Sequence, residues 1–144
     1  MQKFSSLSTG TKLLLVASAA LFLNLSLTWQ KVEVDFGPAG RAELLLDGWD
    51  AWGLLIGLVA LGLLVLTVVI HLTDVELPED VPWGTVSLAL AGVILVATAI
   101  KNLTDAGSTI ASYVGVALAA LVVVGAYLNV RRARAERRSS TVSA

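Results

Sequence analysis

Few residues of this chain have the types and spacing that chemistry requires. Among 144 residues there is one His and no Cys. Because His71 is the only His, the sequence indicates neither a His cluster for a metal nor a Ser–His–Asp set. Without Cys there are no disulfides and no thiolate ligands. We interpret His71 as a helix-end residue whose positive form suits the helix dipole. The sequence therefore predicts no catalytic, cofactor-binding or metal-binding residues, and favours a protein that is not an enzyme.

The other polar residues within or beside the apolar stretches are uncharged. Intramembrane ionisable residues typically mark proton relays and coupled transporters, and none is expected at the centre of a span here. We expect these side chains to bond to neighbouring helices or to the backbone. They are Asn24, Ser26, Thr28, Thr98, Ser112 and Asn129.

Four apolar stretches must position these residues. The chain is 56% hydrophobic and 15% charged, which exceeds the apolar share of ordinary soluble domains. A helix of about 17–25 residues crosses a hydrocarbon core, and none of the stretches alternates as a barrel strand does. We expect the first stretch to be a retained helix rather than a cleaved signal. The predicted spans are residues 13–29, 51–72, 83–100 and 110–130.

The predicted fold is therefore an all-α transmembrane four-helix bundle with a small β-hairpin between the first two helices. The membrane domain covers residues 1–130, with the hairpin at 31–47. Residues 131–144 form a basic tail that we expect to be disordered. Its arginines, between Arg131 and Arg138, favour contact with anionic lipid rather than with nucleic acid.

The basic residues also predict an orientation, because Lys and Arg are enriched on the cytoplasmic side. Seven of the ten, including Lys3 and Lys12, flank the two ends of the chain. Lys31, Arg41 and Lys101 fall on the other side. Both termini are therefore predicted to be cytoplasmic, in the plasma (inner) membrane, with the hairpin outside.

The hairpin prediction rests on alternation to either side of the Gly/Pro turn at residues 37–40. Period-two alternation around such a turn indicates two antiparallel strands. Placing all apolar residues on one face gives a register, and a slip of one residue would mix the faces. The expected pairs are Phe36–Ala42, Val34–Leu44, Val32–Leu46, Lys31–Asp47 and Asp35–Glu43.

A lone hairpin is marginally stable in water, so its apolar face must rest on something. The helix ends, the lipid interface and another protein are the three candidates. Aromatic residues at its edges suit a membrane interface. The candidate interaction residues are Trp29, Val32, Val34, Phe36, Leu44, Leu46 and Trp49.

Small residues at four-residue spacing mark close helix packing. They occur at Gly53 and Gly57, and again at Ala111, Gly115 and Ala119. Packing within the chain and contact between copies are both compatible with this spacing.

Two resemblances rest on the hairpin region. Trp29 and Gly48-Trp49, between the first two helices of a chain with both termini inside, resemble claudin-like four-helix proteins. That family has a Cys pair after its tryptophans, which this chain lacks. The WQKVEV…LDGWDAWG stretch is similar to small four-helix membrane proteins of actinobacteria. This second resemblance implies a topology and no activity.

Together these features favour a non-catalytic membrane protein. We expect an accessory or scaffold subunit, or a protein-interaction subunit, with an extracytoplasmic cap and a membrane-protein partner. The alternative is a small channel or transporter that acts as an oligomer.

Overall fold

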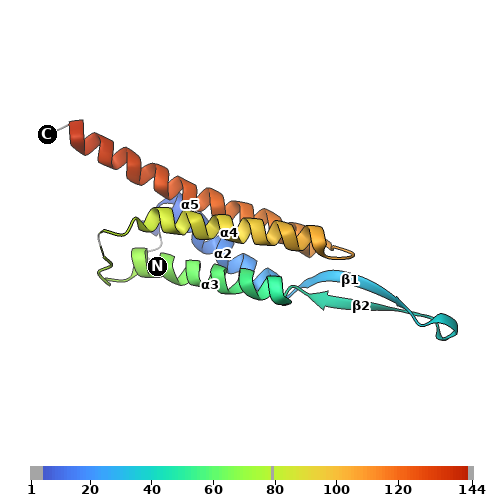
Figure 1. The fold of residues 1–144 in the computed structure, drawn as a ribbon. Coiled ribbons are helices and arrows are strands. Elements are labelled where there is room, and N and C mark those ends of the chain that lie inside the picture. Colours follow the sequence, from blue (N-terminus) through green and yellow to red (C-terminus); the bar gives the residue numbers. More distant parts are fainter. Residues whose placement is uncertain (1–4, 79, 143–144) are drawn as a thin grey trace.

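The computed structural model describes residues 5–78 and 80–142. This part of the chain is mostly helical, with one two-stranded sheet that projects from one end of an elongated bundle (Figure 1). The beginning of the first helix and the end of the last lie at the opposite end (Figure 1). The elements are α2 (Thr9–Asn24), β1 (Thr28–Asp35), the short 3-10 helix η1 (Gly37–Ala39), β2 (Arg41–Asp47), α3 (Ala51–Leu72), α4 (Trp83–Thr104) and α5 (Ile110–Val142).

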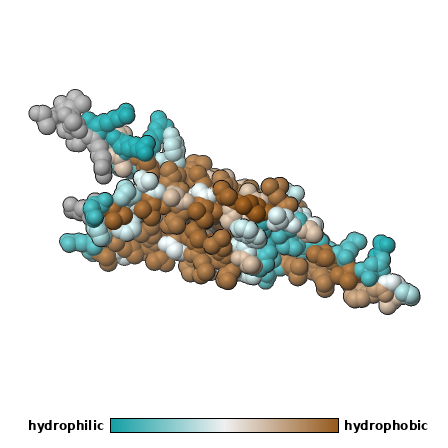
Figure 2. Space-filling model, in the orientation of Figure 1, coloured by the Kyte–Doolittle hydropathy of each residue, from teal (hydrophilic) through white to brown (hydrophobic). Residues whose placement is uncertain are grey.

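The four helices enclose a single apolar core. α2 and α4 each pack against both α3 and α5. Leu21, Ile56, Ile94 and Val122, one from each helix, are fully buried. Large apolar side chains also cover the outer faces of the bundle, which form a hydrophobic belt between polar ends (Figure 2). Such a belt suits lipid, because lipid does not penalise exposed apolar surface as water does.

Three helices are long and apolar enough to cross a membrane: α3, α4 and the Ile110–Glu136 part of α5. α2 is shorter, with 16 residues, which rise only about 24 Å. The first predicted span, residues 13–29, differs from this helix at both ends. The helix starts earlier, where Ser8 Oγ accepts the Thr11 N–H at 3.1 Å. It ends at Asn24 because the chain enters β1 at Thr28.

The helices α3, α4 and α5 begin at the same residues as the other three predicted spans. α3 matches at both ends, and Asp50 caps it by accepting the Gly53 N–H at 2.8 Å. α4 continues four residues beyond Ile100 and so includes Lys101.

α5 continues as far as Val142, through the basic tail that the sequence predicts to be disordered. Ala, Arg and Glu favour helix, and Arg132 Nε lies 2.8 Å from Glu136 Oε1 one turn away. The last two tail residues, 143–144, and Lys3 lie outside the described residues.

The small residues pack within the chain. A Cβ at Gly57 would lie 2.5 Å from the Trp49 ring, and one at Gly115 would lie 2.5 Å from the Trp29 ring. Gly53 and Ala119 are also buried, and Ala111 packs against the core. These small residues therefore serve packing within the chain. Contact between two copies of the chain through them stays a prediction.

Two helix backbones also approach each other closely where α2 crosses α5. A Cβ at Gly125 would lie 2.8 Å from the Leu14 nitrogen and 2.9 Å from the Gly10 oxygen. The two glycines come from distant parts of the chain, so their spacing along the sequence gave no indication of this contact.

The hairpin has the predicted faces but not the predicted register. The observed pairs include Val34–Ala42, Val32–Leu44 and Gln30–Leu46, a shift of two residues that leaves the apolar side chains on one face. The expected pairs Phe36–Ala42, Val34–Leu44 and Val32–Leu46 are therefore wrong.

The turn explains the difference in register. It is a five-residue loop in which the Phe36 N–H donates to the Gly40 carbonyl at 2.8 Å. Gly37 and Gly40 adopt φ values of 65° and 100°, which favour glycine. Pairing Asp35 with Arg41 places their charged groups 3.2 Å apart, whereas the expected register set Asp35 against an acid.

Candidate functional site: the projecting hairpin and its buried anchor

The outer part of the hairpin extends beyond the helix ends (Figure 1). All seven residues of β2 are exposed, and 49% of Leu44 remains accessible. On the same face Phe36 and Leu46 are exposed, while Val32 and Val34 are partly buried. The hairpin therefore does not fold over the helix ends as a lid, which removes the first of its three expected supports. Its apolar face is left for lipid or for a partner.

The opposite face of the hairpin is mostly charged. Lys31 Nζ lies 3.2 Å from Glu43 Oε1, and this pair replaces the expected contact with Asp47. Leu45 is the exception on this face, with 60% of its surface exposed. Two neighbouring leucines of β2, Leu44 and Leu45, thus have similar exposure on opposite faces.

The base of the hairpin is fixed to the loop between α4 and α5. The Lys31 N–H donates to the Gly107 carbonyl, and the Thr109 N–H donates to the Trp29 carbonyl, both at 3.0 Å. Thr109 Oγ1 also donates to the Thr28 carbonyl. A short bridge between Gln30 and Ser108 completes this pairing. These bonds give β1 a second partner segment beside β2 and set the direction in which the hairpin leaves the bundle.

Trp29 and Trp49 lie inside this base and do not form part of the exposed face. Trp29 is fully buried, and its Nε1–H donates to the Asn24 carbonyl at 2.9 Å. Trp49 packs edge-on against Phe22 with ring centroids 5.2 Å apart, and its Nε1–H donates to Ser26 Oγ at 3.1 Å. Their indole N–H groups are thus satisfied within the chain.

The candidate interaction surface therefore contains fewer residues than the sequence predicts. Trp29 and Trp49 anchor the hairpin, and the five remaining predicted residues share its apolar face. We refer to Val32, Val34, Phe36, Leu44 and Leu46 as the apolar hairpin face.

Lys101 is the residue that the sequence interpretation missed. Its side chain is fully buried, with Nζ 2.9 Å from Asp105 Oδ2 and 2.5 Å from Asp50 Oδ2. Nζ also lies 5.5 Å from the centroid of the Trp29 ring. The predicted span ended at Ile100, so Lys101 was assigned to a loop. The i,i+4 spacing of Lys101 and Asp105 was the available signal for a continuing helix.

This cluster joins three elements at the base of the hairpin. Asp50 caps the start of α3, Asp105 follows the last residue of α4, and Trp29 belongs to β1. A buried ammonium is costly unless it is paired, and two carboxylates and an aromatic ring surround this one. Lys101 therefore holds the helix ends and β1 together.

The electrostatics of Asp50 reflect this arrangement. Partial burial alone raises the pKa of its carboxyl group. The hydrogen bond from Lys101, the backbone N–H of Gly53 and the charge of Lys101 outweigh that effect, so the pKa lies below its usual value. Asp50 is thus held in its charged form. Within residues 5–78 and 80–142, no group of three or more His, Asp or Glu side chains is placed to hold a metal ion.

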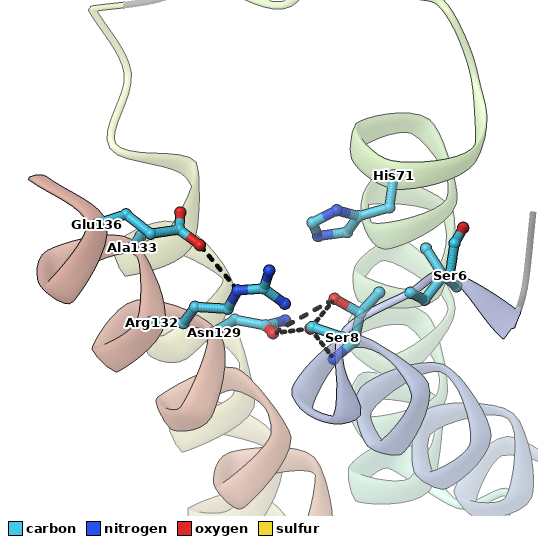
Figure 3. Close-up of a pocket in the computed structure, with 9 residues that line it drawn as sticks. Ser6, Ser8, His71, Asn129, Arg132, Ala133 and Glu136 are labelled. Atoms are coloured by element: carbon cyan, nitrogen blue, oxygen red, sulfur yellow. Dashed lines mark hydrogen bonds and ion pairs between the residues drawn. The ribbon is translucent and has the colours of Figure 1, made fainter.

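A second polar region lies at the other end of the bundle. Figure 3 shows His71 of α3 across a pocket from Arg132 and Glu136 of α5, with Ser8 and Asn129 between them. Ser8 Oγ donates to Asn129 Oδ1 at 2.9 Å. The pocket has a volume of about 310 Å³. Its hydrogen bonds join α2 to α5, and His71 lies at the end of α3 as the sequence indicated.

No family model, no curated protein and no solved structure matches this chain. The resemblances to claudin-like proteins and to actinobacterial four-helix proteins therefore have no support from these comparisons. Arguments about function rest on the geometry alone.

Proposed function

We propose that this protein is a membrane accessory subunit, without catalytic activity of its own, that binds a partner protein outside the membrane through the apolar hairpin face. The observation that carries the proposal is the projection of this face beyond the helix ends. Leu44 and Leu46 remain exposed there and do not pack against the helical bundle. Exposed contiguous apolar surface commonly marks an interaction site.

The anchor supports this proposal. A surface that docks a partner benefits from being held in place before binding, because less conformational freedom is lost on association. The bonds from β1 to Gly107 and Thr109, together with the buried Lys101, provide this support at the base. A hairpin that served only to connect α2 and α3 would need neither.

The proposed location is the plasma (inner) membrane with both termini in the cytoplasm. The exposed arginines near the end of α5, including Arg131 and Arg134, favour that end as the cytoplasmic one. The hairpin leaves the opposite end of the bundle (Figure 1) and would then lie outside.

Site-specific photocrosslinking in intact membranes tests the proposal, with Leu44 and Leu45 as a matched pair. A photoreactive residue at position 44 should give one discrete protein adduct, because Leu44 lies on the apolar hairpin face. The same residue at position 45 should give little of it, since Leu45 lies on the charged face with similar exposure.

A second variant pair measures the contribution of each face. The protein identified by crosslinking should co-purify with the wild-type chain without any crosslinker. Leu44→Ser should reduce the co-purified amount at least about tenfold, because central apolar contacts dominate binding. Leu45→Ser should leave this amount nearly unchanged. Adducts with lipid alone at position 44, or equal protein adducts at both positions, would overturn the proposal.

A further inference from the structure

One face of α5 carries a row of arginines directly beyond the apolar belt. Tyr127, Arg131, Arg134 and Arg138 follow one another at spacings of four, three and four residues, which places them within about 60° around the helix axis. All four are exposed. We call them the arginine stripe. They line a hollow of about 440 Å³ together with Val130 and Ala135.

The arginines of the stripe have no carboxylate partner among the described side chains. The carboxylate of Glu136 pairs with Arg132, which lies on another side of α5 and faces the polar pocket near α2 (Figure 3). Among the described side chains, no carboxylate lies within ion-pair distance of Arg131, Arg134 or Arg138. Three guanidinium groups therefore face one hollow in which the described part of the chain places no carboxylate.

The stripe continues an apolar face of the same helix. Val124 and Tyr127 are exposed one turn apart, and Val124 is part of the apolar outer surface of a helix that is long enough to cross a membrane. Arg131 and Arg134 lie about 6 Å and 10 Å beyond Tyr127 along the helix axis. Tyrosine prefers the level of the lipid headgroups, so the guanidinium groups fall at the level of the phosphates or just beyond them.

We propose that the arginine stripe binds the phosphate groups of anionic phospholipids in the leaflet at this end of the bundle. Guanidinium groups bind phosphate oxygens through paired N–H donors, and Tyr127 supplies an aromatic ring and a hydroxyl at the boundary. A lipid satisfies both parts of the surface at once, because its acyl chains lie along Val124 while its headgroup reaches the arginines. This inference rests on the proposed membrane location but does not depend on a partner for the hairpin.

The test uses the full chain in nanodiscs that contain equal amounts of phosphatidylglycerol and phosphatidylcholine. Lipids that remain bound after transfer to detergent are counted by native mass spectrometry. Wild type should retain phosphatidylglycerol preferentially. Each basic residue near an anionic surface contributes about fivefold, so the triple variant Arg131→Gln, Arg134→Gln, Arg138→Gln should lose the preference.

Two control variants separate the stripe from general charge. Arg132→Gln removes one positive charge from another side of α5 and should keep most of the preference. The triple Arg→Lys variant keeps every charge but lacks the planar fork, and should retain an intermediate preference. Circular dichroism on each variant checks that the helices are intact.

Three results would overturn the proposal. The first is equal retention of both lipids by wild type. The second is an effect of Arg132→Gln as large as that of the triple Gln variant. The third is loss of the bound lipid when about 10 mM inorganic phosphate is added before the measurement. The last result would mean that a free phosphate, and not a lipid, is the ligand. Resistance to phosphate together with loss in the triple Gln variant supports lipid binding.

Discussion

The ammonium of Lys101 lies 5.5 Å from the centroid of the Trp29 ring, fully buried at the point where the hairpin leaves the bundle. This contact connects the last turn of α4 to the first residues of β1. It also brings a charged residue into a helix that otherwise carries apolar and uncharged polar side chains. The projecting hairpin therefore depends on a polar cluster at its base.

Replacing Lys101 with Met should destabilise the protein severely. Met replaces most of the aliphatic stem against Trp29 but leaves Asp105, whose side chain is 7% exposed, without a counter-ion. Removing one partner of a buried ion pair typically costs about 3–5 kcal/mol. Unfolding by denaturant in mixed micelles measures this loss of free energy.

Two further variants identify the cause. Adding Asp105→Asn to Lys101→Met should recover part of the stability, because the buried side chain at position 105 is then uncharged, while Asp50, whose side chain is 42% exposed, can still be solvated. Lys31→Met breaks an exposed pair with Glu43 and should cost roughly 0–1 kcal/mol. Similar losses for Lys101→Met and Lys31→Met would show that the buried cluster is not a special contributor.

Stability should fall at acidic pH through Asp50. Its pKa is lowered in the folded state from the usual 3.8, so the unfolded chain binds its proton more readily. The stabilisation is therefore fully present above pH 3.8 and is lost as the pH falls through the lower folded value. Thermal unfolding from pH 7 to about pH 3 should show a steeper acid decline for wild type than for Asp50→Asn. Parallel declines of the two proteins would contradict this expectation.

The apolar pattern of the sequence was enough to place most helices. α3 was predicted at both ends because a charged residue bounds it at Asp50 and a polar loop follows Leu72. The same rule failed at Lys101, since a charged residue was taken to end a span. Only the positions of Asp50 and Asp105 in three dimensions show that this Lys can be buried.

The hairpin shows a second limit of sequence reasoning. Alternation determines which residues share a face, and those faces were predicted correctly. The register depends on the turn, and a shift of two residues preserves both faces. Alternation therefore could not distinguish Asp35 opposite Arg41 from Asp35 opposite Glu43. The loop at residues 107–109 determines where the strands point. The exposure of the apolar hairpin face therefore depends on a contact between distant parts of the chain.

Gly115→Ala should destabilise the bundle, while Gly92→Ala should not. A Cβ at Gly115 would lie 2.5 Å from the Trp29 ring and 2.9 Å from Asn24 Oδ1, both in the buried core. Overpacking of this kind costs about 1–3 kcal/mol. At Gly92 a Cβ meets nothing within 4 Å, and the higher helix propensity of Ala should stabilise by up to about 1 kcal/mol. Thermal unfolding in detergent compares the two variants, and equal shifts would refute the proposed packing of Trp29.

Single cysteines test the orientation, since the chain has none of its own. Ala39→Cys at the hairpin tip should react with an impermeant maleimide added outside intact cells, because the hairpin is proposed to lie there. Ser143→Cys should react only after the membrane is permeabilised. Labelling of position 143 in intact cells, with position 39 protected, would reverse the proposed topology.

A disulfide can determine the register of the hairpin. Glu33 lies directly opposite Glu43, and Cα atoms of opposed antiparallel residues are about 4.5–5.5 Å apart, within the range that a disulfide spans. The double variant Glu33→Cys, Glu43→Cys should therefore oxidise readily and completely under mild conditions.

The matched variant Asp35→Cys, Glu43→Cys tests the alternative register, in which these two residues would be opposed. Here they are offset by two positions on the same face, so oxidation should be slow. Mass spectrometry of the oxidised proteins measures both fractions. Faster closure of the 35–43 pair would mean that the strands pair two residues away from the register seen here, with Val34 opposite Leu44.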